Sequence, residues 1–348
     1  MNRTGISWTN WTWNLVRGCR QCSEGCEHCY AMDAAHRVNK ANAARGLHQP
    51  YAGLVQLRGG KPKWTGKVKF VMKLLVAPLR KKQPLKIFVN SMSDLFYAPV
   101  SNEEIAAAFG VMAAATWHTF QILTKRAERM VAWFAWVQRT AVHRGMTPAQ
   151  LCFDYARQIA AEEKSAMKVL KCASAIYATD DAAWPLPNVW VGISAEDQDN
   201  ANVRIPLLLQ VPVATRFVSA EPLLGPIDLT LWLKNIGWVI AGCESGDDRR
   251  PAEVDWFRSL RDQCAATGTS FFLKQVVKGE GVTLGPGSKK KQKGIVETPA
   301  LDGQAWAEFP RTPPAPISTP GTLTPERSAL NHQPTLANRT VRRRGGGT

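Results

Sequence analysis

The chain of 348 residues lacks long hydrophobic runs. No stretch approaches the roughly 20 consecutive apolar residues that a membrane-spanning helix needs. The first residues, MNRTGISWTNWTW, contain no apolar core of the kind found in a secretory signal peptide. We therefore expect a cytoplasmic protein without a membrane partner, in a compartment where thiols stay reduced.

Two common signatures are also missing. The six His residues show no metal-ligand spacing. The glycine fingerprint G-x-G-x-x-G of dinucleotide-binding folds does not occur. Its absence disfavours an open doubly wound sheet, which stays as the alternative fold.

Acidic residues are few relative to basic ones: 28 Asp and Glu stand against 44 Lys and Arg, a net charge of +16. From residue 311 onward there are six Arg and one Glu, a net of +5, which leaves +11 for the rest. A basic body indicates a polyanionic partner such as nucleic acid. The other interpretation of this positive charge is a basic surface that only keeps the protein soluble.

Cysteine, in contrast, is concentrated near the N-terminus. Cys19, Cys22, Cys26 and Cys29 lie in the run GCRQCSEGCEHCY, with two, three and two residues between them. Thiolates from short loops hold iron–sulfur clusters. The last three cysteines have the spacing C-x3-C-x2-C, which can ligate three irons of a [4Fe-4S] cluster and leave the fourth open. In radical enzymes that open iron binds S-adenosylmethionine, which is cleaved to a 5′-deoxyadenosyl radical.

Other interpretations of the cysteines remain open. A structural zinc site can use four cysteines, but zinc ribbons separate their two C-x2-C pairs by roughly fifteen or more residues. An electron-transfer cluster of the ferredoxin type uses four cysteines in another order. Disulfides require an oxidising compartment.

Short apolar runs alternate with helical patterns along the chain, which is typical of a parallel sheet with crossover helices. Six such strands plus two doubtful ones predict a partial or complete (β/α) barrel. The expected strands are 12–16, 53–57, 86–90, 118–123, 188–193, 215–219, 237–241 and 269–273, and the expected helices are 31–44, 102–115, 126–138, 199–210 and 255–266. Residues 68–80 are expected to be a helix or irregular cover.

Two regions depart from this alternation. Residues 139–186 are Ala-rich and helical in pattern, and we expect them to be an insertion on the barrel surface. Residues 284–297 read as a basic loop. The domain prediction is a barrel over 1–309 with that insertion, followed by a disordered, basic, Pro- and Thr-rich tail over 310–348.

One helix start has a specific signature. Ser101 precedes the helix at 102–115, and Glu104 follows it three residues later. This spacing predicts a capping box, in which each side chain accepts from the other residue's backbone N–H.

Polar side chains follow almost every predicted strand. The carboxyl ends of barrel strands carry the catalytic residues of barrel enzymes, so these side chains are expected to converge on one cavity. We expect Lys125, Glu221 and Cys243 to be catalytic candidates. The cofactor-binding candidates at the same ends are Asn90, Ser91, Ser93, Asp94, Ser194, Glu196, Gly242 and Glu244.

Each of these residues also has an ordinary structural interpretation. Ser93 and Asp94 can cap a helix, and Glu196 can interact with a helix dipole. Gly242 can allow close approach of an adenosyl group or simply form a turn. Cys243 can be a radical or ligand residue, or a buried inert cysteine.

Eight segments together resemble a known family, the phage gene-product thirty-seven/sixty-eight family of radical-S-adenosylmethionine-like proteins. They occur in order between residue 5 and about residue 275, with a further echo at LDGQAWAEFP. The segments are ISWTNWTWN, GCRQCSEGCEHCYA, IFVNSMSDLF, HTFQILTKRAERM, NVWVGISAED, RFVSAEPLLGPIDL, WVIAGCESG and FFLKQ. The resemblance implies a barrel of the radical-S-adenosylmethionine type with a [4Fe-4S] cluster, and it implies no substrate.

The chain departs from the family pattern at two positions. That pattern emphasises the cysteines matching Cys19, Cys26 and Cys29, and the residue matching Cys22 is often not cysteine. The superfamily spacing instead favours Cys22 as the third ligand, so two overlapping triads remain. Cys243 stands where the family more often has glycine.

These observations predict an enzyme that uses a [4Fe-4S] cluster and S-adenosylmethionine for hydrogen abstraction. Its substrate is expected to be nucleic acid or a nucleotide, in repair or base modification, and its electron donor a flavodoxin or ferredoxin. The alternative is a non-enzymatic, zinc-containing nucleic-acid-binding protein.

Overall fold

The computed structural model describes residues 1–173, 183–246, 248–290 and 294–310. All of them belong to one compact unit, Met1–Pro316. The expectation of a disordered tail falls on 311–348 and lies outside the described residues. Within the described residues, no helix combines the length and apolar character that a membrane crossing needs.

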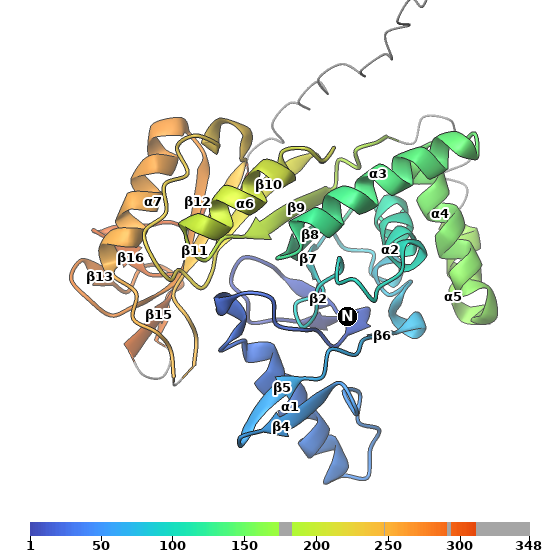
Figure 1. Cartoon of the computed structure of the whole chain (residues 1–348), viewed down its shortest axis with the longest axis horizontal. Coiled ribbons are helices and arrows are strands. Elements are labelled where there is room, and N and C mark those ends of the chain that lie inside the picture. Colours follow the sequence, from blue (N-terminus) through green and yellow to red (C-terminus); the bar gives the residue numbers. More distant parts are fainter. Residues whose placement is uncertain (174–182, 247, 291–293, 311–348) are drawn as a thin grey trace, which may run out of the picture. The chain divides into compact units, whose positions relative to one another are not determined.

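A largely parallel sheet forms the centre of the fold (Figure 1). Seven parallel strands stand side by side in the order in which they occur along the described chain. They are β2 (Trp11–Trp13), β7 (Lys86–Val89), β8 (Thr119–Thr124), β9 (Val189–Ser194), β10 (Thr215–Ala220), β11 (Trp238–Gly242) and β12 (Ser270–Val277).

Short antiparallel strands flank this sheet. The strand β1 (Asn2–Arg3) pairs with β2 at one edge, and β15 (Ile295–Glu297) and β14 (Lys289–Lys290) extend the other edge beyond β12. No pairing joins β1 to β14 among the described residues, so the sheet is open there. The described parts of the basic loop expected at 284–297 thus include a β-hairpin.

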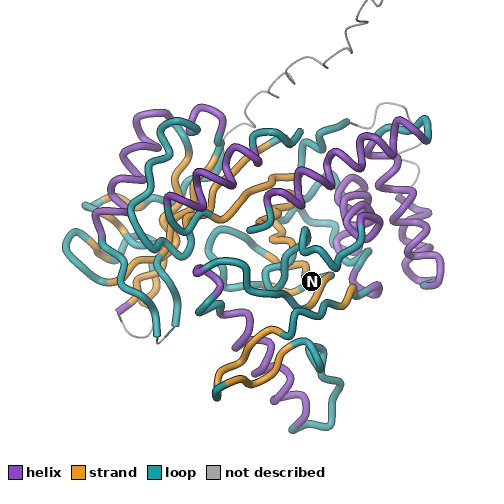
Figure 2. The backbone as a smooth tube through the Cα atoms, viewed as in Figure 1, coloured by secondary structure: helices purple, strands orange, loops and turns teal. Residues whose placement is uncertain are grey.

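Helices connect the parallel strands (Figure 2). Their residues pack in one large core against alternate strand residues such as Ile87, Ile122 and Val239. These helices are α2 (Asn102–Ala114) after β7, α3 (Ala127–His143) after β8, α6 (Gln198–Leu208) after β9 and α7 (Val254–Thr267) after β11. The capping box predicted at Ser101 and Glu104 is present.

The other face of the sheet carries a separate aromatic core. It contains Trp8, Phe88, Phe217, Trp238 and Phe272, which are all buried. Because successive strand side chains point to opposite faces, each strand contributes to both cores. Polar residues from the strand ends line one cavity together with Trp8 and Phe88 of this aromatic core.

The expected insertion holds the end of α3 together with α4 (Pro148–Ile159) and α5 (Lys164–Ala173). The helix α4 packs closely on α2, and Gly110 of α2 permits this contact, because a Cβ atom there would lie 2.2 Å from the Cys152 carbonyl oxygen. The insertion is therefore part of the main core. Its residues 174–182 lie outside the described residues.

Two expected strands differ in part from the structure. The run 12–16 is split into β2 and β3 (Val16–Arg17). The run 53–57 becomes β4 (Val55–Arg58), which pairs with β5 (Lys61–Trp64) in a small sheet apart from the central one. In this run only Leu54 is a buried apolar residue, so local pattern alone did not define its partner.

Residues 68–80 take the irregular form of the two that were expected. They contain β6 (Lys69–Phe70) and two short 3-10 turns.

Three more short strands complete the described chain. They are β13 (Val282–Thr283), β16 (Ala300–Leu301) and β17 (Gln304–Ala305), which form one small sheet. The following residues lie along β12, where Leu273 N donates to the Trp306 carbonyl oxygen at 2.8 Å. Phe309 then packs against Trp238 and Phe272 in the aromatic core.

Candidate functional site

A cavity of about 220 Å³ opens at the carboxyl ends of the parallel strands. Its walls come from the cysteine loop between β3 and α1 (Tyr30–Ala43) and from the ends of β7 through β12. Trp8 and Phe88 of the aromatic core also line this cavity. The site candidates that line it are Cys19, Cys26, Cys29, Asn90, Ser91, Ser93, Asp94, Lys125, Ser194, Glu221, Cys243 and Glu244.

Three candidates do not line this cavity: Cys22, Glu196 and Gly242. Cys22 is exposed, whereas the other three clustered cysteines are half-buried. The Sγ atoms of Cys22 and Cys26 are 3.9 Å apart. Among the described residues, no three His, Cys, Asp or Glu side chains are arranged to hold a metal ion.

The thiols differ in their tendency to ionise. The Cys22 thiol beside Cys26 lowers the pKa of Cys26, because it can donate a hydrogen bond to the thiolate. Burial raises the pKa of Cys19 to about 12 and also raises the pKa of Cys29. Cys26 is thus the thiolate that this loop offers most readily as a ligand.

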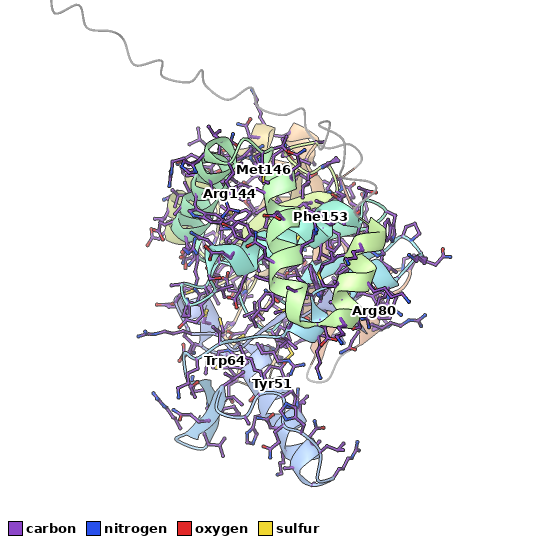
Figure 3. All side chains as sticks on the ribbon, turned by 90° about the vertical axis from the view of Figure 1, so that its right-hand side faces the viewer. Tyr51, Trp64, Arg80, Arg144, Met146 and Phe153 are labelled. Atoms are coloured by element: carbon purple, nitrogen blue, oxygen red, sulfur yellow. The ribbon has the colours of Figure 1, made fainter. Side chains whose placement is uncertain are left out.

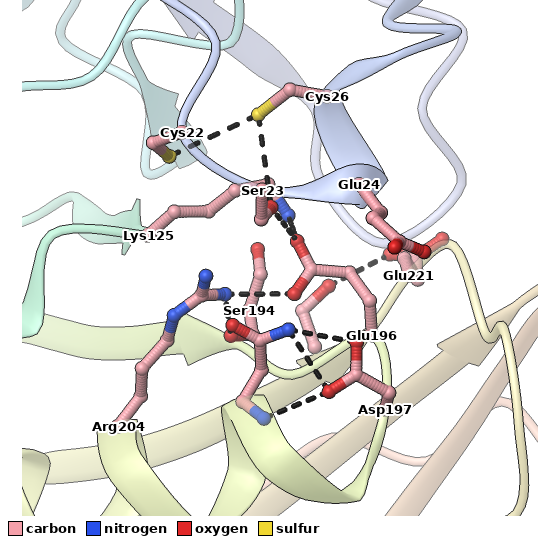
Figure 4. A network of polar contacts seen from close by, with 12 residues as sticks. Cys22, Ser23, Glu24, Cys26, Lys125, Ser194, Glu196, Asp197, Arg204 and Glu221 are labelled. Atoms are coloured by element: carbon pink, nitrogen blue, oxygen red, sulfur yellow. Dashed lines mark hydrogen bonds and ion pairs between the residues drawn. The ribbon is translucent and has the colours of Figure 1, made fainter.

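Glu196 connects the cysteine loop to the end of β9 (Figure 4). Its Oε1 accepts from Ser23 Oγ at 2.9 Å and pairs with Lys125 Nζ, and its Oε2 pairs with Arg204 Nη1 at 2.7 Å. A Cβ atom at Gly25 would lie 2.4 Å from Glu196 Cγ, so only glycine lets the loop approach this closely. Glu196 therefore positions the cysteine loop from behind the cavity wall.

The Glu196 carboxylate is fully buried. Burial raises its pKa, but the positive charges of Lys125 and Arg204 outweigh burial, so the pKa lies below its ordinary value. Glu196 is consequently an anion at neutral pH, and its two cations compensate the cost of burying that charge.

Asp94 forms a second tether for the loop. Its carboxylate accepts from Thr124 Oγ1 at 2.8 Å and from the Lys125 backbone N–H at 3.1 Å, and it pairs with Arg126 at 2.8 Å. Arg126 also donates to the Arg20 carbonyl oxygen at 2.6 Å and lies 3.8 Å from Cys19 Sγ. The end of β8 is thereby linked to the first cysteine.

Asn90 has an unusual backbone and a side-chain amide without a described partner. Its φ is 60°, in the left-handed region, and its Oδ1 accepts from the Val16 N–H at 3.1 Å. Its Nδ2 is buried and has no hydrogen-bond partner among the described residues. A buried, unpaired donor in a cavity wall is unfavourable unless a ligand or a water molecule supplies the acceptor.

Glu221 pairs with Lys274 across the cavity. The Lys274 Nζ to Glu221 Oε1 distance is 2.7 Å, and Ser219 Oγ donates to Glu221 Oε2 at 3.1 Å. A Cβ atom at Gly242 would lie 2.7 Å from Glu221 Oε1. Gly242 therefore makes room for the Glu221 carboxylate.

The loop after β11 completes the wall. Cys243 is 3% exposed, and burial raises the pKa of its thiol to about 11, so the thiol keeps its proton at neutral pH. Glu244 pairs with Arg250 at 2.7 Å, and Arg250 donates to the Glu24 carbonyl oxygen at 2.9 Å. This loop thus also contacts the cysteine loop.

Several residues of the site escaped the sequence analysis. Arg204 lies on α6 and Arg250 in a loop, so neither follows a strand. Trp8 and Tyr30 line the cavity from segments before β2 and after the cysteines. The strand-end pattern does include Lys274, which follows the last expected strand, whereas the sequence contains no signal for Arg204 or Arg250.

Comparison with known proteins gives one match. A family model described as "Protein of unknown function (DUF5131)" matches residues 3–310. No curated protein and no solved structure matches the chain. Since the match covers nearly all of the described residues, the chain belongs to this family of unknown function, DUF5131.

Proposed function

We propose that the protein is a radical S-adenosylmethionine enzyme with a [4Fe-4S] cluster in its cysteine loop. The observation that carries the proposal is the position of this loop. It follows the first parallel strand and covers a cavity into which the other strands direct polar side chains. Cofactor enzymes need such an enclosed site to orient the reactive group and exclude water.

The strand order supports a partial barrel. Seven parallel strands follow one another without reversal of direction along the sheet, whereas a doubly wound sheet reverses its strand order. A right-handed crossover at each step places the helices on one face. The other face then surrounds the aromatic core and the cavity, as in a barrel that is left open.

The chemistry of the donor set supports an iron–sulfur cluster. Cys19, Cys26 and Cys29 line one cavity, and thiolates are the usual ligands of such clusters. No three ligand side chains surround one point among the described residues, so cluster binding would draw the three thiols together. Bound there, the cluster would supply the electron that cleaves S-adenosylmethionine to a 5′-deoxyadenosyl radical. A flavodoxin or ferredoxin would serve as the electron donor.

The chain's own residues would bind and orient the reactants. Asn90 Nδ2 offers a donor to a carboxylate or hydroxyl of the cofactor. Lys125 and the Lys274–Glu221 pair supply charges of both signs around the cavity. Cys243 lines the same cavity and keeps its proton on Sγ at neutral pH. Because Lys125, Glu221 and Cys243 all line this cavity, we assign the three to the catalytic group.

The proposed substrate is nucleic acid or a nucleotide. Its support is the net charge of +16, which favours association with polyanions. A base within a duplex would have to be flipped out to reach the cavity.

Anaerobic reconstitution with iron and sulfide tests this proposal. The protein should bind a cluster and, with S-adenosylmethionine and dithionite, release 5′-deoxyadenosine measured by chromatography. Cys29→Ala should abolish both, and Cys152→Ala, a change at a buried cysteine in the helical insertion, should leave both intact. Protein that takes up zinc and no iron would overturn the proposal.

One distance favours the alternative, a zinc-containing nucleic-acid-binding protein. Two thiolates on one tetrahedral zinc ion, with Zn–S bonds of about 2.3 Å, lie about 3.8 Å apart. The Cys22 and Cys26 Sγ atoms are 3.9 Å apart. In this alternative Cys22 is a ligand and the protein holds zinc rather than iron, so metal content separates the two functions.

A further inference from the structure

A second cavity lies directly beside the cysteine loop. Its volume is about 620 Å³, and its lining includes Arg20, Arg58, Trp64, Lys67 and Tyr97. Trp64 also lines the cysteine cavity, so the two cavities share this side chain. A ligand that contacts Trp64 in the second cavity therefore lies close to the first.

The surrounding segment is depleted of acidic residues. Between Asp33 and Asp94 the chain contains 13 Lys and Arg and no Asp or Glu. Five of these cations lie on or just after the hairpin of β4 and β5: Arg58, Lys61, Lys63, Lys67 and Lys69. A large part of the net charge of +16 is thus concentrated in this segment.

The cations that line the second cavity have no acidic partner. Among the described residues, Arg20, Arg58 and Lys67 form no ion pair, although each is exposed. Lys61 differs, since it pairs with Asp248 at 2.7 Å. Exposed cations without counter-charges around one cavity create a positive potential that attracts phosphate groups.

Aromatic side chains lie between these cations. Trp64 is half-buried and packs against Tyr51, with ring centroids 6.3 Å apart. Both residues are labelled in Figure 3. Tyr97 is fixed by its hydroxyl, which donates to the Gly66 carbonyl oxygen at 2.9 Å. Fixed aromatic side chains beside phosphate-binding cations form the combination that single-stranded nucleic acids require.

We propose that the second cavity docks single-stranded nucleic acid. Its phosphates contact Arg20, Arg58 and Lys67, and a base stacks on Trp64 close to the cysteine cavity. The inference rests on the substrate class in the proposed function and assigns that substrate to a surface. It does not depend on the radical chemistry.

Charge reversal on this surface tests the inference. The probe is a fluorescein-labelled oligothymidylate of about 12 nucleotides, bound to the full-length protein without S-adenosylmethionine or reductant and measured by fluorescence anisotropy. The variant Arg58→Glu/Lys67→Glu should bind at least about tenfold more weakly. Loss of two phosphate contacts should lower the slope of log affinity against log salt by about 1.4.

A matched control separates local contacts from net charge. Lys164→Glu/Lys168→Glu introduces the same charge change at exposed lysines of α5 and should weaken binding by no more than about threefold. Trp64→Leu should weaken binding by roughly tenfold and leave the salt slope unchanged, because stacking is not ionic. Trp64→Phe should restore most of the affinity.

The outcomes distinguish the two proposals. Equal losses in the two charge-reversed variants would overturn the docking surface, even if 5′-deoxyadenosine is formed. Tight binding with the expected losses but without 5′-deoxyadenosine would leave the surface intact and overturn the radical chemistry. Poly-glutamate that binds as tightly as the oligonucleotide, without dependence on Trp64, would indicate an acidic protein partner instead.

Discussion

Among the four clustered cysteines, Cys22 differs in its position. It is exposed and lies outside the cavity that Cys19, Cys26 and Cys29 line. The sequence left two overlapping triads open, because spacing does not determine which way a loop turns. Only the fold of the loop over the strand ends distinguishes them.

We predict that the triad is Cys19, Cys26 and Cys29. Changing Cys19, Cys26 or Cys29 to Ala should abolish cluster binding, because each removes a thiolate that faces the cavity. Cys22→Ala should retain the cluster, as measured by iron and sulfide content after anaerobic reconstitution. Loss of iron in Cys22→Ala together with its retention in Cys19→Ala would assign the third ligand to Cys22.

Glu196 is predicted to be the residue on which the cysteine loop depends most. Glu196→Gln leaves Lys125 and Arg204 near each other without the compensating charge, and we expect it to lower the free energy of unfolding by about 3 kcal/mol. Urea denaturation measures this change. The control is Glu128→Gln at an exposed position of α3, expected to change stability by less than about 0.5 kcal/mol.

The same carboxylate predicts a pH dependence. Its pKa is depressed in the folded protein, so its contribution is present above the unfolded-state pKa of about 4.3 and is lost as the pH falls through the lower, folded-state pKa. The stability difference between wild type and Glu196→Gln should therefore shrink below about pH 4. A difference that stays constant with pH would contradict the buried ion pairs.

Among the elements, the helices and the buried strands were the most predictable. The helix expected at 102–115 is α2, and its capping box is fixed by residues within one turn. The strand expected at 188–193 is β9, shifted by one residue. The hairpin of β4 and β5 was not identified, because its Lys- and Gly-rich sequence has too few buried apolar residues to define a pattern.

The capping box gives a prediction for α2. Ser101→Ala removes the hydroxyl that accepts from the Glu104 N–H, and it should lower the free energy of unfolding by about 1 kcal/mol. Ser101→Thr keeps an accepting oxygen and should lose less than half as much. Thermal denaturation followed by circular dichroism compares the two, and equal losses would show that the cap contributes little.

At the scale of the whole molecule, Phe309, which follows β17, packs on the aromatic core. Phe309 packs against Trp238 at 5.3 Å and Phe272 at 5.5 Å between ring centroids, and Lys86 Nζ lies 4.0 Å from its ring centre. Lys86 begins β7, whereas Phe272 belongs to β12, so Phe309 bridges strands far apart in the sheet.

Phe309→Ala is therefore expected to destabilise the fold by about 2 kcal/mol, less than a fully buried phenylalanine would, because Phe309 is half-buried. Urea denaturation followed by tryptophan fluorescence measures this change as a shift of the unfolding midpoint. Leu231→Ala, at a side chain that is 79% exposed, is the matched control and should leave the midpoint unchanged. An unchanged midpoint for Phe309→Ala would show that this end of the core does not need it.

The α/β alternation, the capping box of α2, the cysteine loop and the polar residues at the strand ends follow from the sequence alone, because each depends on neighbours within a few residues. Long-range packing places three of the cysteines along the cavity, brings Arg204 and Lys125 to Glu196, and makes Trp64 part of two cavities. Contacts of the site join residues as many as 226 positions apart, as between Glu24 and Arg250. Such partners are selected by packing of the whole sheet, and no local pattern specifies them.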